Sequence, residues 1–408
     1  MPISRLSDAL AKRLETLGQE NRLKGDESVI CGVAPARDGA GPRYLLEGEG
    51  DRPFLRMNSN SYLGMSFQAA VIAAEEEAAR GLGTGPGAVR FISGTWSPHV
   101  RLERRLAAFH GRDAAMLFSS AYATVMGILP PLITGNTAVI SDELNHNCII
   151  NAIALARPGG KHIYRHLDMD DLARCLEQAA KASVRAIVVT DGIFSMRGDH
   201  APLDRIMALA RKFDSAFPEN VVVAVDDSHG VGAFGPTGRG TEEFTQSAPA
   251  DLLVATLGKA FGVNGGYVVA GETIIRYLRE TSPFYIYSNP TTPAEAAAAG
   301  AAVDTLDCPQ GVALLDRLRA MAAHFRAGLA KLGFETLPGE HPIVPLMLRD
   351  TARTSDMVAH LRRHGILATG LNYPVVPKGD EEIRFQINAD HTIQDLDEAL
   401  EILHLAGG

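Results

Sequence analysis

The runs Ala186-Ile-Val-Val-Thr190 and Val221-Val-Val-Ala-Val225 lie on either side of the stretch Leu203-Asp-Arg-Ile-Met-Ala-Leu-Ala-Arg-Lys-Phe213. Both runs are short, continuous and rich in β-branched residues, as strands are when helices cover both faces of a parallel sheet. The stretch between them repeats its apolar residues at helical spacing. A strand, a helix and a second strand in this order predict an α/β fold with a mostly parallel sheet.

The pattern continues beyond this unit and then changes. A further strand is predicted at Leu252-Leu-Val-Ala-Thr256. From about residue 290, an alanine-rich helix (Ala294 to about Leu306) leads into a second helix that ends at Gly333. Strands are predicted to follow at 343–348 and 383–387. We therefore predict an N-terminal arm over residues 1–55, a large α/β domain over 56–295 and a small C-terminal α+β domain over 296–408.

The composition is that of an ordinary globular protein. The 408 residues are 46% hydrophobic and 21% charged, and the net charge of -9 argues against a nucleic acid or an anionic membrane as partner. The four cysteines are far apart and contain no C-x-x-C pair, so we expect free thiols and no metal site. Because there is no apolar signal region at the N-terminus and no long apolar run, we expect a cytoplasmic protein without membrane insertion.

Two segments carry the groups that a particular cofactor requires. Asp226-Asp-Ser-His229 follows directly on the predicted strand, at the sheet edge where open α/β folds bind ligands. Lys259 follows Thr256-Leu-Gly258 and is surrounded by glycines, which leave room for a bulky planar ligand. An amine, a carboxylate and hydroxyl groups are what pyridoxal phosphate (PLP) needs. The sequence therefore predicts a PLP site, although a polar turn at Asp226–His229 and a surface lysine stay open as separate explanations.

Two further patterns are misleading. Gly230-Val-Gly-Ala-Phe-Gly235 matches the dinucleotide motif G-x-G-x-x-G, but Pro236-Thr-Gly-Arg-Gly240 follows where that motif needs a helix. Gly258-Lys259 is not a phosphate-binding P-loop, because Leu253 stands at the position of its first glycine. We therefore do not expect hydride transfer or nucleotide hydrolysis.

The ordered motifs over roughly residues 50 to 405 resemble the α-oxoamine synthases, which are PLP enzymes with the aspartate aminotransferase fold (fold type I). The segments that carry the resemblance are Asn58–Gly64, Val89–Thr95, Ser141–His146, Asp191–Met196, Asp226–His229, Thr256–Lys259, Tyr373–Gly379 and Ile383–Gln386. Within the family, Arg90–Thr95 and Tyr373–Gly379 look most similar to the glycine C-acetyltransferases, also called 2-amino-3-ketobutyrate CoA ligases.

This resemblance implies roles for individual residues. Lys259 would form the Schiff base and remove the substrate α-proton, and Asp226 would pair with the pyridine nitrogen. The other implied cofactor contacts are His229 and Ser195 at the phenolic oxygen, His146 on the ring face, and Ser120, the backbone of Ala121 and Tyr122, Thr256 and Ser288 of the partner subunit at the phosphate. The resemblance thus implies that this protein is a homodimer with its active site at the subunit interface. For His146, a helix-terminal histidine without a ligand is the alternative explanation.

Arg384 is the candidate for the substrate carboxylate. In a strand at Ile383-Arg-Phe-Gln-Ile387, the three apolar side chains point to one face and Arg384 to the other. An arginine that faces a cleft can bind a carboxylate through two parallel hydrogen bonds. Periodicity alone does not distinguish this from an arginine that faces solvent. By resemblance, Asn60 would assist at the same carboxylate.

The implied reaction is a Claisen condensation of a small amino acid with an acyl-CoA, best matched by glycine and acetyl-CoA. The chain departs from the family pattern in a shortened loop after Lys259, in Val125, in Arg197 and in the triplet His166-Leu167-Asp168. Of these, the loop and Val125 bear on the acyl pocket. The alternative is a decarboxylating synthase for a longer acyl chain with alanine or serine, similar to 8-amino-7-oxononanoate synthase or serine palmitoyltransferase. A PLP aminotransferase, an aldolase and a non-catalytic PLP-fold protein stay open as further alternatives.

Overall fold

A seven-stranded sheet forms the centre of the computed structural model, which describes residues 3–20, 22–23, 25 and 27–407. The strand order is β4-β10-β9-β8-β7-β5-β6. The strands are β4 (Ala114–Phe118), β5 (Thr137–Asp142), β6 (Gly160–Tyr164), β7 (Arg185–Asp191), β8 (Val221–Asp226), β9 (Leu252–Thr256) and β10 (Gly266–Ala270). Neighbours from β9 to β6 are parallel, whereas β10 runs antiparallel to both β4 and β9.

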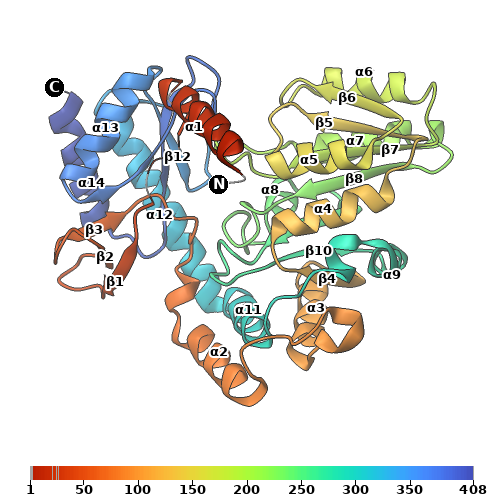
Figure 1. Ribbon diagram of the computed structural model, residues 1–408, viewed down its shortest axis with the longest axis horizontal. Coiled ribbons are helices and arrows are strands. Elements are labelled where there is room, and N and C mark those ends of the chain that lie inside the picture. The colour runs from red at the N-terminus through yellow and green to blue at the C-terminus, as the bar shows by residue number, and fades with distance from the viewer. Residues whose placement is uncertain (1–2, 21, 24, 26, 408) are drawn as a thin grey trace.

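Helices cover both faces of this sheet (Figure 1). Alternate residues of β7 point to opposite sides, so that Ala186 and Val188 pack in one core while Ile187 and Val189 pack in the other. The first core includes residues of α2 (Ala69–Leu82), α3 (Ser97–Phe109), α6 (Met169–Ala179), α7 (Leu203–Phe213) and α11 (Pro293–Leu306). The second includes residues of α4 (Ala121–Leu132), α5 (Asn147–Ala156), α9 (Glu272–Thr281) and α10 (Pro283–Ile286). The α/β fold predicted from the strand–helix–strand pattern is confirmed.

A third core lies around a smaller C-terminal sheet of order β11-β12-β15-β14. The C-terminal part of the chain that contains this sheet comprises β11 (Glu335–Thr336), β12 (Ile343–Met347), α13 (Thr351–Arg363), β13 (Ile366–Leu367), β14 (Thr369–Leu371), β15 (Glu382–Gln386) and α14 (Ile393–Gly407). The long helix α12 (Pro309–Lys331) joins the two parts, because Leu315 and Leu318 pack in the large core and Phe325 and Leu329 in the C-terminal core.

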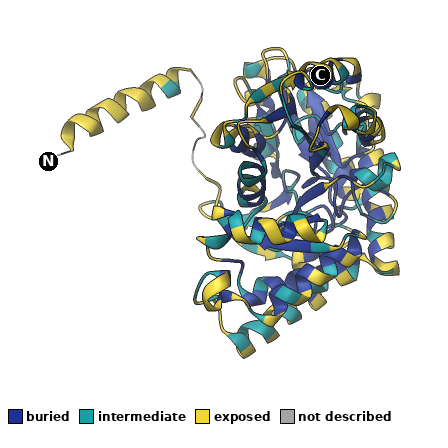
Figure 2. Cartoon of the chain, turned by 90° about the vertical axis from the view of Figure 1, so that its right-hand side faces the viewer, coloured by how far each residue is buried: buried dark blue, intermediate teal, exposed yellow. Residues whose placement is uncertain are grey.

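The N-terminal segment is more structured than an arm. It forms β1 (Ile30–Ala34), β2 (Arg43–Leu46) and β3 (Pro53–Arg56), and β3 pairs in parallel with β13 of the C-terminal part. Arg43 forms an ion pair of 2.8 Å with Asp395 of α14. Helix α1 (Ser4–Gln19) buries none of its residues and extends away from the rest of the chain in Figure 2. The domain boundaries at residues 55 and 295 stay predictions.

The remaining elements are short: η1 (Met65–Phe67), the π-turn η2 (Arg90–Gly94), α8 (Thr241–Thr245) and η3 (Asp214–Ala216). The Gly230–Gly235 segment forms turns instead of opening a long helix, as the sequence predicted. Within the described part of the chain, no helix has the length and apolar character needed to cross a membrane. Across the same residues, no cluster of three or more metal-ligating side chains is present.

Candidate active site

Residues from the ends of several sheet strands surround a small cavity of about 60 Å³. It lies where β4, β5, β7, β8 and β9 end, the edge at which open α/β sheets bind their ligands. Its lining residues are Ala121, Tyr122, His146, Cys148, Asp191, Ile193, Ser195, Asp226, Ser228, His229 and Lys259. We call this space the lysine cavity. It brings together the amine, the carboxylate and the two histidines that the sequence singled out.

Lys259 reaches the cavity from the turn between β9 and β10. The turn is closed by a hydrogen bond of 2.9 Å from the Gly262 N–H to the Lys259 carbonyl. Gly262 has a φ of 69°, and a side chain there would meet the backbone of Ser66. Burial lowers the pKa of the Lys259 amine to about 8, although the carboxylates of Asp226 and Asp191 favour its charged form. A substantial neutral fraction at physiological pH makes this amine a usable nucleophile and base.

Two carboxylates from the neighbouring strands β7 and β8 line the same cavity as the amine. Asp226 ends β8; one of its oxygens accepts the Ser228 N–H at 3.1 Å and the other faces the Cys148 thiol at 3.6 Å. Asp191 ends β7 and accepts the His146 N–H at 2.9 Å. Burial and the nearby Asp226 carboxylate raise the pKa of Asp191 well above its usual range. The pair therefore favours a cationic partner between or above them.

The two histidines are held by different neighbours. His229 places its Nδ1 2.8 Å from the Tyr62 hydroxyl, and its carbonyl lies 2.9 Å from His341 Nε2. Burial lowers the pKa of His229 far below its usual range, so its ring is neutral. His146 caps α5, where its Nδ1 accepts the Cys148 N–H at 3.2 Å. Burial also lowers the pKa of His146. Both rings are thus fixed in orientation and uncharged.

The N-terminus of α4 forms another wall. Ser120 caps the helix and accepts the Ala123 N–H at 3.1 Å, while Ala121 and Tyr122 line the cavity. A helix N-terminus is a ready site for an anion such as a phosphate. Thr256 does not line the cavity: its hydroxyl donates to the Gly265 carbonyl at 3.2 Å within the β9–β10 turn.

Arg384 lies on β15 and points out of the C-terminal core, as its strand periodicity predicted. Ile383 and Phe385 pack in that core. The Arg384 guanidinium donates from Nη1 to the Ser195 carbonyl at 2.9 Å, and its buried Nε has no hydrogen-bond partner. The side chain of Asn60 accepts a hydrogen bond from Gln386 on the same strand. The spare guanidinium donor is the kind of group that a substrate carboxylate can satisfy.

A second and larger cavity of about 380 Å³ adjoins the first and shares His146 and Ser195 with it. We call it the outer cavity. Its apolar lining comprises Leu144, Ile150, Phe194, Met196, Met347, Val375, Val376 and Pro377. Its charged lining comprises Glu143, Arg197, Asp380 and Glu382. Burial raises the pKa of Glu382 to about 8, and one of its carboxyl oxygens has no partner.

The structure groups the predicted residues into two sets. Lys259, His146, Asp226, His229, Ser195, Ala121 and Tyr122 line the lysine cavity, and Ser120, Thr256, Ser288, Asn60 and Arg384 do not. Sequence reasoning missed Tyr62, Asp191 and Cys148. Tyr62 and Asp191 lie inside the matching segments Asn58–Gly64 and Asp191–Met196, which was the available signal. Cys148 had none, because only the start of α5 brings it to Asp226.

Known proteins resemble this chain over most of its length. The family model "Aminotransferase class I and II" matches residues 52–403. An 8-amino-7-oxononanoate synthase of Bacillus pumilus is 39% identical over 86% of this chain and 88% of its own length. The mitochondrial 2-amino-3-ketobutyrate coenzyme A ligase of Mus musculus is 40% identical over 85% of this chain and 82% of its own. Serine palmitoyltransferase from S. paucimobilis, solved with PLP and myriocin, superposes with a TM-score of 0.85 at 27% identity, covering 99% of this chain and 98% of that one.

Proposed function

The chain belongs to the α-oxoamine synthase family of PLP-dependent acyltransferases, and we propose that it joins the α-carbon of a small amino acid to the acyl group of a thioester, releasing the thiol. The observation that carries this proposal is the pairing of two cavities. The lysine cavity holds an amine, a carboxylate and two neutral histidines, and it shares a wall with an apolar outer cavity.

The side chains around the lysine cavity are those that the cofactor requires. The Lys259 amine has a lowered pKa of about 8, and the buried Ser228 hydroxyl has no partner in the structure. Asp226 would hold a ring nitrogen, His229 and Ser195 would bond a phenolic oxygen, and the N-terminus of α4, whose Ala121 and Tyr122 line the same cavity, would hold the phosphate. When bound, PLP supplies an aldehyde for the amine and an electron-accepting ring.

With the cofactor bound, individual residues of this chain would have separate roles in the reaction. Lys259 moves the proton at the substrate α-carbon, which a neutral amine can accept. The Asp226 carboxylate keeps the ring nitrogen protonated. Arg384 binds the substrate carboxylate and turns the α-carbon toward Lys259, with Asn60 beside it. His146 stands on the wall between the cavities, where the α-carbon and the thioester carbonyl must meet.

The proposed acyl donor differs from the acetyl-CoA that the sequence analysis expected. Acetyl-CoA was the best match from two sequence segments, yet 8-amino-7-oxononanoate synthases and the ketobutyrate ligase are almost equally identical to this chain. An acetyl group occupies little of a 380 Å³ cavity with eight apolar lining residues. We therefore favour the longer-chain alternative, with CoA as the carrier.

The charged residues of the outer cavity also bear on which group can stand at the far end of the acyl chain. Three carboxyl groups (Glu143, Asp380 and Glu382) accompany its single arginine, Arg197, which already pairs with Asp199 at 3.0 Å. A chain that ends in a carboxylate would meet the carboxylates of Glu143 and Asp380 there, which costs free energy, whereas Glu382, with its pKa raised to about 8, is largely protonated at neutral pH. An uncharged acyl chain is therefore the expected substrate.

The test is thiol release by the PLP-loaded protein across glycine, alanine and serine with acyl-CoAs of increasing length, including one series with a terminal carboxylate. We expect release with uncharged chains longer than acetyl. Release confined to glycine and acetyl-CoA would restore the acetyltransferase assignment. Amino-group transfer to an oxoacid without any thiol release would overturn acyl transfer altogether.

A further inference from the structure

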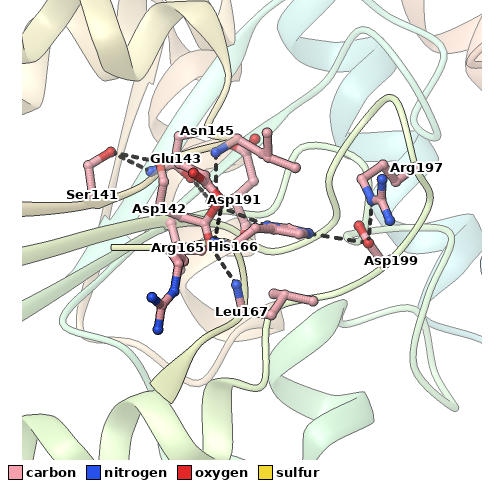
Figure 3. Close-up of polar contacts among 12 residues, drawn as sticks. Ser141, Asp142, Glu143, Asn145, Arg165, His166, Leu167, Asp191, Arg197 and Asp199 are labelled. Carbon is pink, nitrogen blue, oxygen red and sulfur yellow. Dashed lines mark hydrogen bonds and ion pairs between the residues drawn. The ribbon is translucent and has the colours of Figure 1, made fainter. Parts of the chain in front are cut away.

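The imidazole of His166 lies between two loops that lead to the active site (Figure 3). Its Nδ1 is 3.0 Å from a carboxylate oxygen of Asp142, the last residue of β5. Its Nε2 is 3.2 Å from a carboxylate oxygen of Asp199, in the loop after β7. The β5 loop continues to His146, and the β7 loop contains Ser195. One ring thus bridges the segments that carry two side chains of the lysine cavity.

The bridge needs a proton on each ring nitrogen. An ionised carboxylate only accepts hydrogen bonds, so a neutral imidazole can satisfy one of the two aspartates and only the imidazolium satisfies both. Burial by itself lowers the pKa of His166, but its hydrogen bonds to Asp142 and Asp199 and their charges outweigh burial and raise the pKa to about 9. At neutral pH the ring is therefore a cation between two anions.

Each of the two aspartates also forms hydrogen bonds that hold nearby backbone in place. Asp142 also accepts the N–H groups of Leu144 at 2.9 Å and Leu167 at 3.1 Å. Leu167 has a φ of 57°, an unfavourable left-handed conformation for a leucine that these contacts hold in place. Asp142 thus ties the β5 loop to the loop that carries His166.

The other carboxylate organises the β7 loop. Asp199 accepts the Arg197 Nε–H at 3.0 Å, and its carbonyl accepts the Phe194 N–H at 3.0 Å. The Phe194 ring packs edge-on against His166, with ring centroids 4.4 Å apart. Between these anchors, Ser195 lines both cavities, and Met196 and Arg197 line the outer one. The position of this short segment sets the wall that the two cavities share.

We propose that His166 is a positioning residue: it bridges Asp142 and Asp199 and so fixes the segment 195–197 that separates the cofactor site from the acyl site. The inference rests on the proposed acyl transfer for its kinetic readout only. The charged and titratable groups around His166 are Asp142 at the end of β5, Glu143 directly after it, Arg197 and Asp199 after β7, and Arg165, Asp168 and Asp171 in its own loop and α6. Because the pKa of His166 is raised, the bridge is intact below pH 9 and is lost as the pH rises through that value.

The test compares His166→Gln with His162→Gln, a histidine of the adjacent strand β6, as the matched control. In His166→Gln we expect the KM for the acyl thioester to rise by about tenfold or more, because a small misplacement of a positioning wall is costly, while the KM for the amino acid changes less. PLP affinity of the apoprotein should fall between pH 8 and pH 10 in the wild type, and His166→Gln should already be weak at pH 7 and lose that step. Because Lys259 also titrates near pH 8, the difference between the two proteins is the diagnostic quantity.

An NMR titration of ¹⁵N-labelled histidines tests the bridge without any activity. We expect both His166 nitrogens to stay protonated to about pH 9, and Asp199→Asn to lower that midpoint; this variant also serves if His166→Gln does not fold. A neutral His166 at pH 7, or a His166→Gln variant with the KM values and PLP profile of His162→Gln, would overturn the proposal. If thiol release is absent throughout, the NMR and PLP measurements still decide it, so its failure is separable from failure of the proposed function.

Discussion

Lys259 carries the proposed chemistry because its side chain lines the lysine cavity and burial lowers the pKa of its amine to about 8. We predict that Lys259→Ala abolishes thiol release while the fold survives, since the side chain is part of no hydrophobic core and its removal relieves burial of a cation. Thiol release and circular dichroism check this, with Lys161→Ala, an exposed lysine of β6, as the control. Turnover at the wild-type rate in Lys259→Ala would remove the basis of the mechanism.

Arg384 is expected to act on the amino acid and not on the thioester. Losing a buried charged contact to a carboxylate costs about 2–5 kcal/mol, so Arg384→Ala should raise the KM for the amino acid by at least tenfold. Arg384→Lys should recover only part of the loss, because an ammonium cannot form two parallel bonds. Steady-state kinetics with each substrate varied in turn decide the matter; an unchanged amino-acid KM would place the carboxylate elsewhere.

At the scale of elements, the contact between β10 and the first turn of α4 shapes the proposed phosphate site. A side chain at Gly266 would overlap the backbone of Ala121, so even a methyl group must push the helix N-terminus away. This close approach requires glycine, although the position is an ordinary part of a strand.

We therefore predict that Gly266→Ala lowers PLP affinity and destabilises the fold by about 1–3 kcal/mol, the usual cost of overpacking. Gly271→Ala, directly after the same strand, is the matched control, because its added methyl group would lie 3.8 Å from its nearest neighbour, Asp113. PLP titration and thermal unfolding of both variants provide the measurement. Equal PLP affinity in the two variants would show that the contact between β10 and α4 does not shape the cofactor site.

At the scale of the whole molecule, several large apolar side chains are exposed in the single chain. Tyr287 is 79% exposed, and Phe91 and Ile92 are each 67% exposed. Ser288 follows Tyr287 and lines neither cavity of its own chain. Apolar exposure of this kind is typical of a surface that a partner covers. It is consistent with a homodimer in which Ser288 completes the phosphate site of the other subunit.

We predict a species of about twice 43.6 kDa by light scattering. Mixing Lys259→Ala with Ser288→Ala subunits should restore activity above that of either variant alone, because one site of the mixed dimer then has both groups intact. Ser288→Ala homodimers should bind PLP more weakly than wild type. A monomer with full activity would contradict the shared site.

Local patterns in the sequence were sufficient for much of this protein. Strands β7, β8 and β9 and helix α7 follow from β-branched runs and helical spacing, because these preferences act between near neighbours in the chain. Helix α12 ends at Lys331, two residues before the Gly333 that marked its end. The site residues on strand ends could be predicted for the same reason: a parallel strand delivers whatever follows it to one edge of the sheet.

Other features depend on contacts between distant segments, and only the tertiary structure decided them. Pairing of β3 with β13 joins residues about 310 apart, so the sequence suggested only an N-terminal arm. The Thr256 hydroxyl donates to the Gly265 carbonyl across the β9–β10 turn, a contact that the sequence did not indicate, and its role at the phosphate stays a prediction. In the sequence, His166 was only part of a triplet that departs from the family pattern, and the structure places it between Asp142 and Asp199. The sequence by itself determined which groups each strand presents, whereas long-range packing decided which of them meet, because no local preference sets the distance between separate loops.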